Sequence, residues 1–113
     1  MTATTHHPAS IAVSLQLLRD ILEEQFATHT NQLTELVVCG ALPHHGGHDP
    51  HTLAALTKTS RQAVADTAHA LQRMSQGTYG ICERCHQAIP LGRLRELPEA
   101  SFCVPCHQVR PLR

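Results

Sequence analysis

Residues 77–106 read GTYGICERCHQAIPLGRLRELPEASFCVPC and contain two Cys-x-x-Cys pairs, Cys82/Cys85 and Cys103/Cys106. Each pair places two thiols on one tight turn, and two such turns about 15–20 residues apart supply the four soft donors of a tetrahedral zinc site. The segment between the pairs is rich in turn formers and predicts a small hairpin with too little apolar surface to fold alone. Metal binding then supplies on the order of 10 kcal/mol. The sequence therefore predicts one Zn²⁺ held by these four cysteines.

Three alternative roles for these cysteines have to be compared with zinc. Each pair is followed by a histidine, His86 or His107, so the c-type haem motif Cys-x-x-Cys-His also occurs twice. Haem attachment requires export and large apolar pockets, but the N-terminal residues lack the pattern of an export signal, and the chain has two Phe, one Tyr and no Trp. Disulfides are the second alternative, and they need an oxidising compartment. In the third, His86 or His107 replaces a neighbouring cysteine as ligand.

The composition of the chain argues against several classes of function. The 113-residue chain has a formal net charge of zero and 3% aromatic residues, so neither broad electrostatic attachment to nucleic acid nor base stacking is indicated. We expect no sequence-specific DNA binding, no membrane span and a cytoplasmic location. No nucleophile–base constellation is visible, and a closed four-thiolate site leaves zinc no open position for water. The chain is therefore not expected to be an enzyme.

The residues before the cysteines predict a mainly α fold. Residues 1–8 are small and polar and are expected to form a disordered tail. Residues 9–76 are expected to form an antiparallel two-helix coiled-coil hairpin with a tip loop at 41–49, and residues 77–113 form the zinc finger. A bundle completed by a dimer partner is the alternative for the helices.

Hydrophobic periodicity and capping signals set the two helices. The first is predicted from Ser10 to Cys39 with Gly40 as a stop signal, and its apolar positions are Ile11, Leu15, Leu18, Leu22, Phe26, Leu33 and Val37. The second is predicted from Pro50 to Gln76, between an Asp49 N-cap and Gly77. Its apolar face is Leu53, Leu56, Val64, Leu71 and Met74, with Ser60 and Thr67 as polar interruptions.

Positions beyond the cysteines also match a known family. The run GTYGICERC at 77–85, followed by Ile89-Pro90, Arg93-Leu94, Pro98, Ala100 and the second cysteine pair, resembles the zinc finger of the DksA/TraR family. The match covers about the last third of the chain. It implies one zinc on the four cysteines beside a coiled-coil hairpin, and a regulator that binds RNA polymerase through the secondary channel. A nucleotide effector acting with the polymerase is compatible with this resemblance.

The predicted hairpin tip matches the family's D-x-x-D-x-A motif in part. Asp49 and Ala54 match, whereas Thr52 stands in place of the second aspartate. The resemblance implies that Asp49, Thr52 and Ala54 form the arm tip that approaches the polymerase interior. A hydroxyl cannot act through charge as a carboxylate does, so the loss of one of the two charges at Thr52 is expected to affect the family's usual regulatory activity. His86 is a second departure, since the family has glycine there, and a left-handed backbone costs histidine about 1 kcal/mol.

Several residues remain outside this assignment. Arg93 and Arg95 are candidate docking charges, or ordinary surface residues. His44, His45, His48 and His51 cluster near the tip and raise the hypothesis of a second metal site. Cys39 is interpreted as an ordinary helix residue, with a reactive thiol as the alternative. The alternative function is a zinc-stabilised interaction module or redox-sensing module that does not bind RNA polymerase.

Overall fold

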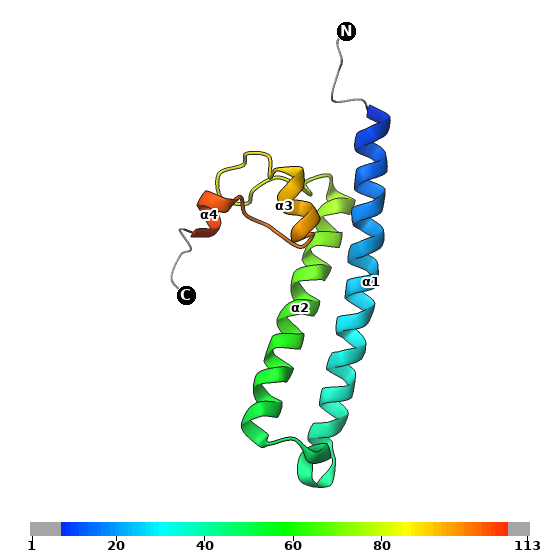
Figure 1. Ribbon diagram of the computed structural model, residues 1–113, viewed down its shortest axis with the longest axis vertical. Coiled ribbons are helices and arrows are strands. Elements are labelled where there is room, and N and C mark those ends of the chain that lie inside the picture. The colour runs from blue at the N-terminus through cyan, green and yellow to red at the C-terminus, as the bar shows by residue number, and fades with distance from the viewer. Residues whose placement is uncertain (1–7, 109–113) are drawn as a thin grey trace.

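The computed structural model describes residues 8–108, with side-chain surroundings from Ser14 onward, so residues 1–7 of the predicted tail lie outside the described part. Its elements are α1 (Pro8–Ala41), a short turn η1 (Pro43–Gly47), α2 (Pro50–Gln76), α3 (Leu91–Glu96) and α4 (Val104–Gln108). The molecule is a rod of 66 × 31 × 21 Å, with α1 and α2 side by side and antiparallel (Figure 1). The finger lies beside the C-terminal end of α2, far from the tip.

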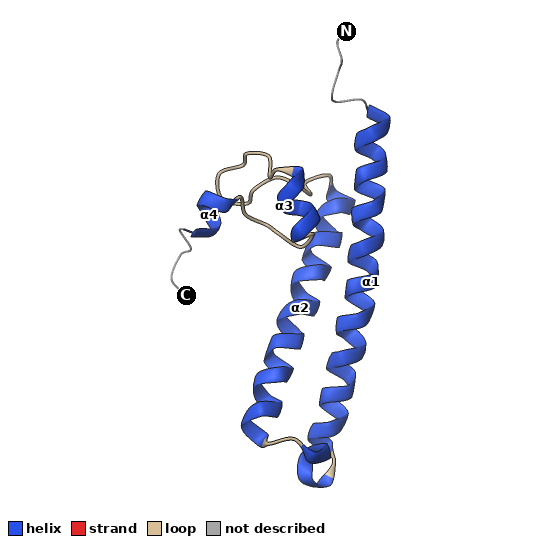
Figure 2. Ribbon diagram, viewed as in Figure 1, coloured by secondary structure: helices blue, strands red, loops and turns tan. Residues whose placement is uncertain are grey.

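The predicted fold class, a helical hairpin plus a small four-cysteine module, is confirmed. Figure 2 shows helices and loops through the described residues, and the single antiparallel bridge there joins Ile81 to Ala88. This bridge spans the first cysteine pair, and the segment between the two pairs contains helix α3 rather than a regular hairpin. α1 continues to Ala41, so Gly40 lies inside the helix and does not end it.

Local capping chemistry fixes both ends of α2. The Asp49 carboxylate accepts from the backbone N–H groups of His51 (3.0 Å) and Thr52 (3.1 Å), and Pro50 occupies the first helical position. At the other end Gly77 has φ of 78°, and its N–H donates to the carbonyls of Arg73 and Met74. Both boundaries of this helix agree with the sequence prediction because these signals are local.

The buried positions of the hairpin concentrate near the finger. Leu18 and Leu22 of α1 are 3% and 0% exposed, as the predicted apolar face required. Leu15, Val37 and Leu56, also assigned to buried faces, are 43%, 49% and 41% exposed. Figure 1 shows that α1 runs past the end of α2. Thr67, predicted to interrupt the face, is 2% exposed, and its hydroxyl is satisfied by donating to the Ala63 carbonyl at 2.8 Å.

The tip is a left-handed turn. His44, His45 and Gly46 have φ values of 61°, 52° and 61°, and the His45 N–H donates to the Leu42 carbonyl at 3.0 Å. Gly46 packs against α1 so closely that a Cβ there would lie 2.9 Å from the Cys39 Sγ. Glycine is thus required at 46 by both backbone conformation and space, and Cys39 is a packing residue of the tip.

Candidate metal centre and arm tip

The four predicted ligands converge on one point. The Sγ atoms of Cys82, Cys85, Cys103 and Cys106 all lie within 4.8 Å of one another. The Cys85–Cys103 separation is 3.7 Å, whereas a tetrahedron with Zn–S bonds of 2.3 Å has edges of about 3.8 Å. A disulfide needs about 2.05 Å. The geometry fits a tetrathiolate metal site.

The first cysteine pair forms a turn in which backbone N–H groups point at the sulfur of Cys82. The N–H groups of Arg84 and Cys85 lie 3.4 Å and 3.5 Å from the Cys82 Sγ. The His86 N–H closes the first turn on the Cys82 carbonyl at 2.9 Å, and His86 has φ of 63°. The left-handed backbone expected at this position is therefore present on a histidine, with its steric cost.

The thiols differ in acidity because they share hydrogen bonds. Burial of Cys82 opposes ionisation, but the N–H groups of Cys85, Cys103 and Arg84 outweigh it and lower the pKa of this thiol to about 5. The neighbouring Cys103 thiol, together with burial, raises the pKa of Cys106 to about 12. A divalent cation removes this conflict by taking the place of the protons on all four sulfurs.

An apolar cluster holds the two turns against the helices. Leu18, Ile89 and Leu94 are buried together with Cys82 and Cys103, and Tyr79 packs at the edge. The Tyr79 hydroxyl donates to the Pro98 carbonyl at 2.8 Å, and burial raises its pKa to about 12. Leu18 belongs to α1, so the first helix contributes directly to the surroundings of the metal site.

Arg73 is a buried residue of this region that sequence reasoning missed. Its side chain on α2 is 5% exposed, and its guanidinium donates to the carbonyls of Thr78 (2.8 Å) and Ile81. Its Nε lies 3.5 Å from the Glu83 carboxylate, which also contacts His69 at 2.6 Å. The available signal was its position between the buried Ala70 and the partly buried Met74 on the apolar face of α2.

The predicted tip residues lie at the start of α2, and all three are exposed. One oxygen of Asp49 caps the helix, and the Thr52 hydroxyl lies 3.5 Å from that oxygen. Asp49 and Thr52 are therefore neighbours, and the second position contributes no charge. Ala54 lies apart from them, on a groove between α1 and α2.

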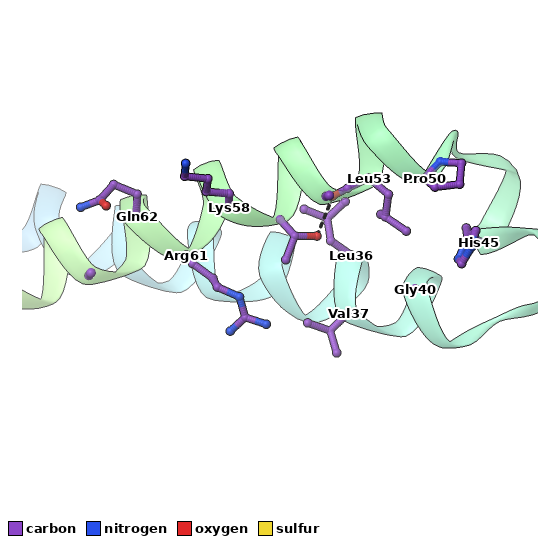
Figure 3. Close-up of a pocket in the computed structure, with 12 residues that line it drawn as sticks. Leu36, Val37, Gly40, His45, Pro50, Leu53, Lys58, Arg61 and Gln62 are labelled. Carbon is purple, nitrogen blue, oxygen red and sulfur yellow. Dashed lines mark hydrogen bonds between the residues drawn. The ribbon is translucent and has the colours of Figure 1, made fainter. Parts of the chain in front are cut away.

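This groove has a volume of about 770 Å³ and an apolar lining with basic residues at its margin. Figure 3 shows Leu53 and Leu36 between the helices, Arg61 and Val37 on one side, and Lys58 and Gln62 on the other. His45 and Pro50 close its tip end. The groove exists because small residues, such as Gly40 and Ala54, leave space where the two helices meet.

Other sequence candidates separate into structural and surface residues. The Arg93 Nε donates to the Phe102 carbonyl at 2.9 Å, so this residue fixes the finger internally, whereas Arg95 is exposed. In the part of the chain that the structure describes, the four cysteines are the one group of three or more metal-ligating side chains close enough to share an ion. The tip histidines do not form a second such group. No helix in the same residues is long and apolar enough to cross a membrane.

Comparison with known proteins agrees with this geometry. Residues 77–111 match the family model of the prokaryotic DksA/TraR C4-type zinc finger. The chain is similar to an uncharacterised protein of Aquifex aeolicus (47% identity over 51 residues; 45% of this chain, 35% of the relative). It is also similar to general stress protein 16O of Bacillus subtilis (38% over 56 residues; 50% of this chain, 34% of the relative). The chain thus covers about a third of the length of these curated relatives.

The fold also matches a solved structure, transcription factor DksA2 from Pseudomonas aeruginosa. The TM-score is 0.65 at 20% identity, covering 86% of this chain and 82% of that one. The fold and the site therefore define a class of protein in which a four-cysteine zinc finger is attached to a helical hairpin. Residues 77–111 are a zinc finger of the DksA/TraR C4 type, and the cofactor of this finger is Zn²⁺.

Proposed function

We propose that this protein is a non-enzymatic transcription regulator that binds RNA polymerase in the cytoplasm, with its helical arm inserted into the secondary channel. One observation carries the proposal: an exposed carboxylate, Asp49, stands at the far end of a narrow rod whose other end has a DksA/TraR zinc finger. The similarity of the fold to transcription factor DksA2 supports it. A nucleotide effector bound with the polymerase is compatible with it.

Within this proposal residues 9–76 are the arm and residues 77–113 the finger. Cys82, Cys85, Cys103 and Cys106 hold zinc, and the ion's chemistry is structural, since it neutralises thiolates and fixes two turns. Four sulfur ligands leave no position for substrate. The arm tip comprises Asp49, Thr52 and Ala54, and it acts through the charge of Asp49 on basic groups or a catalytic Mg²⁺ within the channel.

The test must separate the two roles of Asp49, because its carboxylate also caps α2. Asn is as good an N-cap as Asp but is neutral, so Asp49→Asn is expected to keep the stability of the hairpin. Asp49→Ala is expected to lose about 1 kcal/mol. If the charge carries the function, both variants bind core RNA polymerase but lose their effect on transcription in vitro.

Co-purification with core polymerase is the prior measurement. A wild-type chain that fails to bind would refute the proposal and leave a zinc-stabilised or redox-sensing module with another partner. Binding with full activity in Asp49→Asn would keep the partner and refute the role of the tip charge. Thr52→Asp, which restores a second carboxylate, is expected to strengthen the transcriptional effect without altering zinc content.

A further inference from the structure

We infer that Arg73 couples the zinc site to the arm, so that zinc occupancy fixes how the finger is held on the last turns of α2. The inference rests on the cysteine ligand set of the proposed function and goes beyond it. It assigns to Arg73 the role of a positioning residue, one that acts on the metal site through the backbone around Cys82.

The three groups that Arg73 contacts include both neighbours of a metal ligand. Its guanidinium donates to the carbonyl of Ile81, directly before Cys82, and its Nε faces the carboxylate of Glu83, directly after it. Its third contact, the Thr78 carbonyl, begins the segment that leads to the ligand. The planar fork of arginine matches such divergent acceptors, whereas a lysine ammonium offers a single point of attachment.

These acceptors stay in position only while the first cysteine turn is folded. The Glu83 N–H donates to the Ser101 carbonyl at 2.9 Å, which joins this turn to the segment before Cys103. Metal bound to Cys82 and Cys103 therefore stabilises both sides of that contact. A buried guanidinium without partners is strongly unfavourable, so loss of the turn forces Arg73 out of its site.

The effect continues into α2 because Arg73 also serves the helix end. Its carbonyl accepts the N–H of Gly77 and that of Thr78, at 2.9 Å for the latter, so displacement of Arg73 disturbs the C-cap. His69, one turn earlier, is tied to Glu83 at 2.6 Å and extends the same network toward the arm. Leu18 connects α1 to the site through apolar contact alone. Arg73 and His69 both link α2 to the finger through polar contacts, and Arg73 is the buried one of the two.

Coupling of this kind is reciprocal, so a change at Arg73 must change the affinity for zinc. Zinc affinity is measured by competition with a chromophoric chelator, after helical content has been checked by circular dichroism. Arg73→Met keeps length and apolar stem but removes the donors, and we expect at least tenfold weaker zinc binding, as for other residues that orient metal ligands. Arg73→Lys should bind zinc with an affinity between that of the wild type and that of Arg73→Met. Arg61→Met, an exposed arginine on the same helix, is the matched control and should bind zinc as the wild type does.

A second measurement keeps the inference testable if Arg73→Met does not fold. Amide hydrogen exchange of the unaltered chain is compared with and without zinc, together with Glu83→Gln. We expect zinc removal to raise exchange in residues 69–77 as well as in the finger, and Glu83→Gln to reproduce part of that increase with zinc bound. Exchange that changes only after residue 77, or wild-type zinc affinity in a folded Arg73→Met, would overturn the inference. A wild-type chain that binds zinc but not polymerase would refute the proposed function while leaving the coupling intact.

Discussion

The zinc end and the tip end of the hairpin are made from the same two helices, yet they are packed differently. Near the finger, Leu18, Leu22, Thr67, Ala70 and Arg73 are all buried. Among residues 33–62, which the structure describes throughout, Leu53 is the one buried side chain. The packed end holds the two helices together. The tip half is then free to present polar groups and an open groove.

The zinc ligands should show the largest effect at the packed end. Cys103→Ser removes one of four thiolates, and we expect loss of bound zinc and of ordered structure from residue 78 onward, because the finger cannot fold on its apolar contacts alone. Cys39→Ser, at the tip, should retain one zinc per chain. Metal analysis and circular dichroism check both. If Cys103→Ser retained tightly bound zinc, the expected difference between the zinc end and the tip end would be contradicted.

Leucine truncations should differ between the two ends. Leu22 is fully buried, so Leu22→Ala should lower the free energy of unfolding by about 3 kcal/mol through lost burial and a residual cavity. Leu56 is 41% exposed, and Leu56→Ala should cost less than about 1 kcal/mol. Urea titrations of the zinc-loaded protein measure the difference. Equal losses would show that the tip half is packed as tightly in solution as the base.

Tyr79 makes the stability of the zinc end depend on pH in the alkaline range. Its pKa is raised to about 12 from an ordinary value of 10.0, so the folded state holds the proton longer than the unfolded chain does. Its contribution to stability is therefore present below pH 10 and is lost as pH rises toward 12. Tyr79→Phe should cost about 1 kcal/mol at pH 8 through loss of the bond to Pro98. This variant should also lose stability less steeply between pH 10 and 12 than the wild type.

Relief of strain at His86 should give the smallest change, and one that stabilises. His86 has φ of 63°, which glycine adopts freely, so His86→Gly should raise the free energy of unfolding by up to about 1 kcal/mol. His107 also follows a ligand but lies in α4, and His107→Gly should be destabilising. Thermal melts of the two variants compare these positions. A destabilised His86→Gly would mean that the imidazole itself supports the site.

Much of this architecture was predictable because its signals are local. Cysteine spacing, the Asp49 cap and the Gly77 stop each act within a few residues, and they fixed the metal site and the bounds of α2. Burial of Arg73 was not predictable, because it depends on acceptors at Thr78, Ile81 and Glu83 that only the folded finger supplies. Exposure of Val37 and Leu56 was missed for a related reason: periodicity identifies an apolar face but not how closely its partner approaches. The tip turn was expected as a loop, without its left-handed sense.

The contact between Gly46 and Cys39 has a practical consequence for work on this protein. Five cysteines are present, and the one outside the metal cluster sits where the chain reverses direction. Because Gly46 packs against this sulfur, an alkylating group on that side would push the glycine backbone outward and widen the rod at its narrow end. If the arm enters a channel as proposed, a single chemical adduct at Cys39 would block that entry, while the zinc at the other end of the hairpin would keep its four ligands.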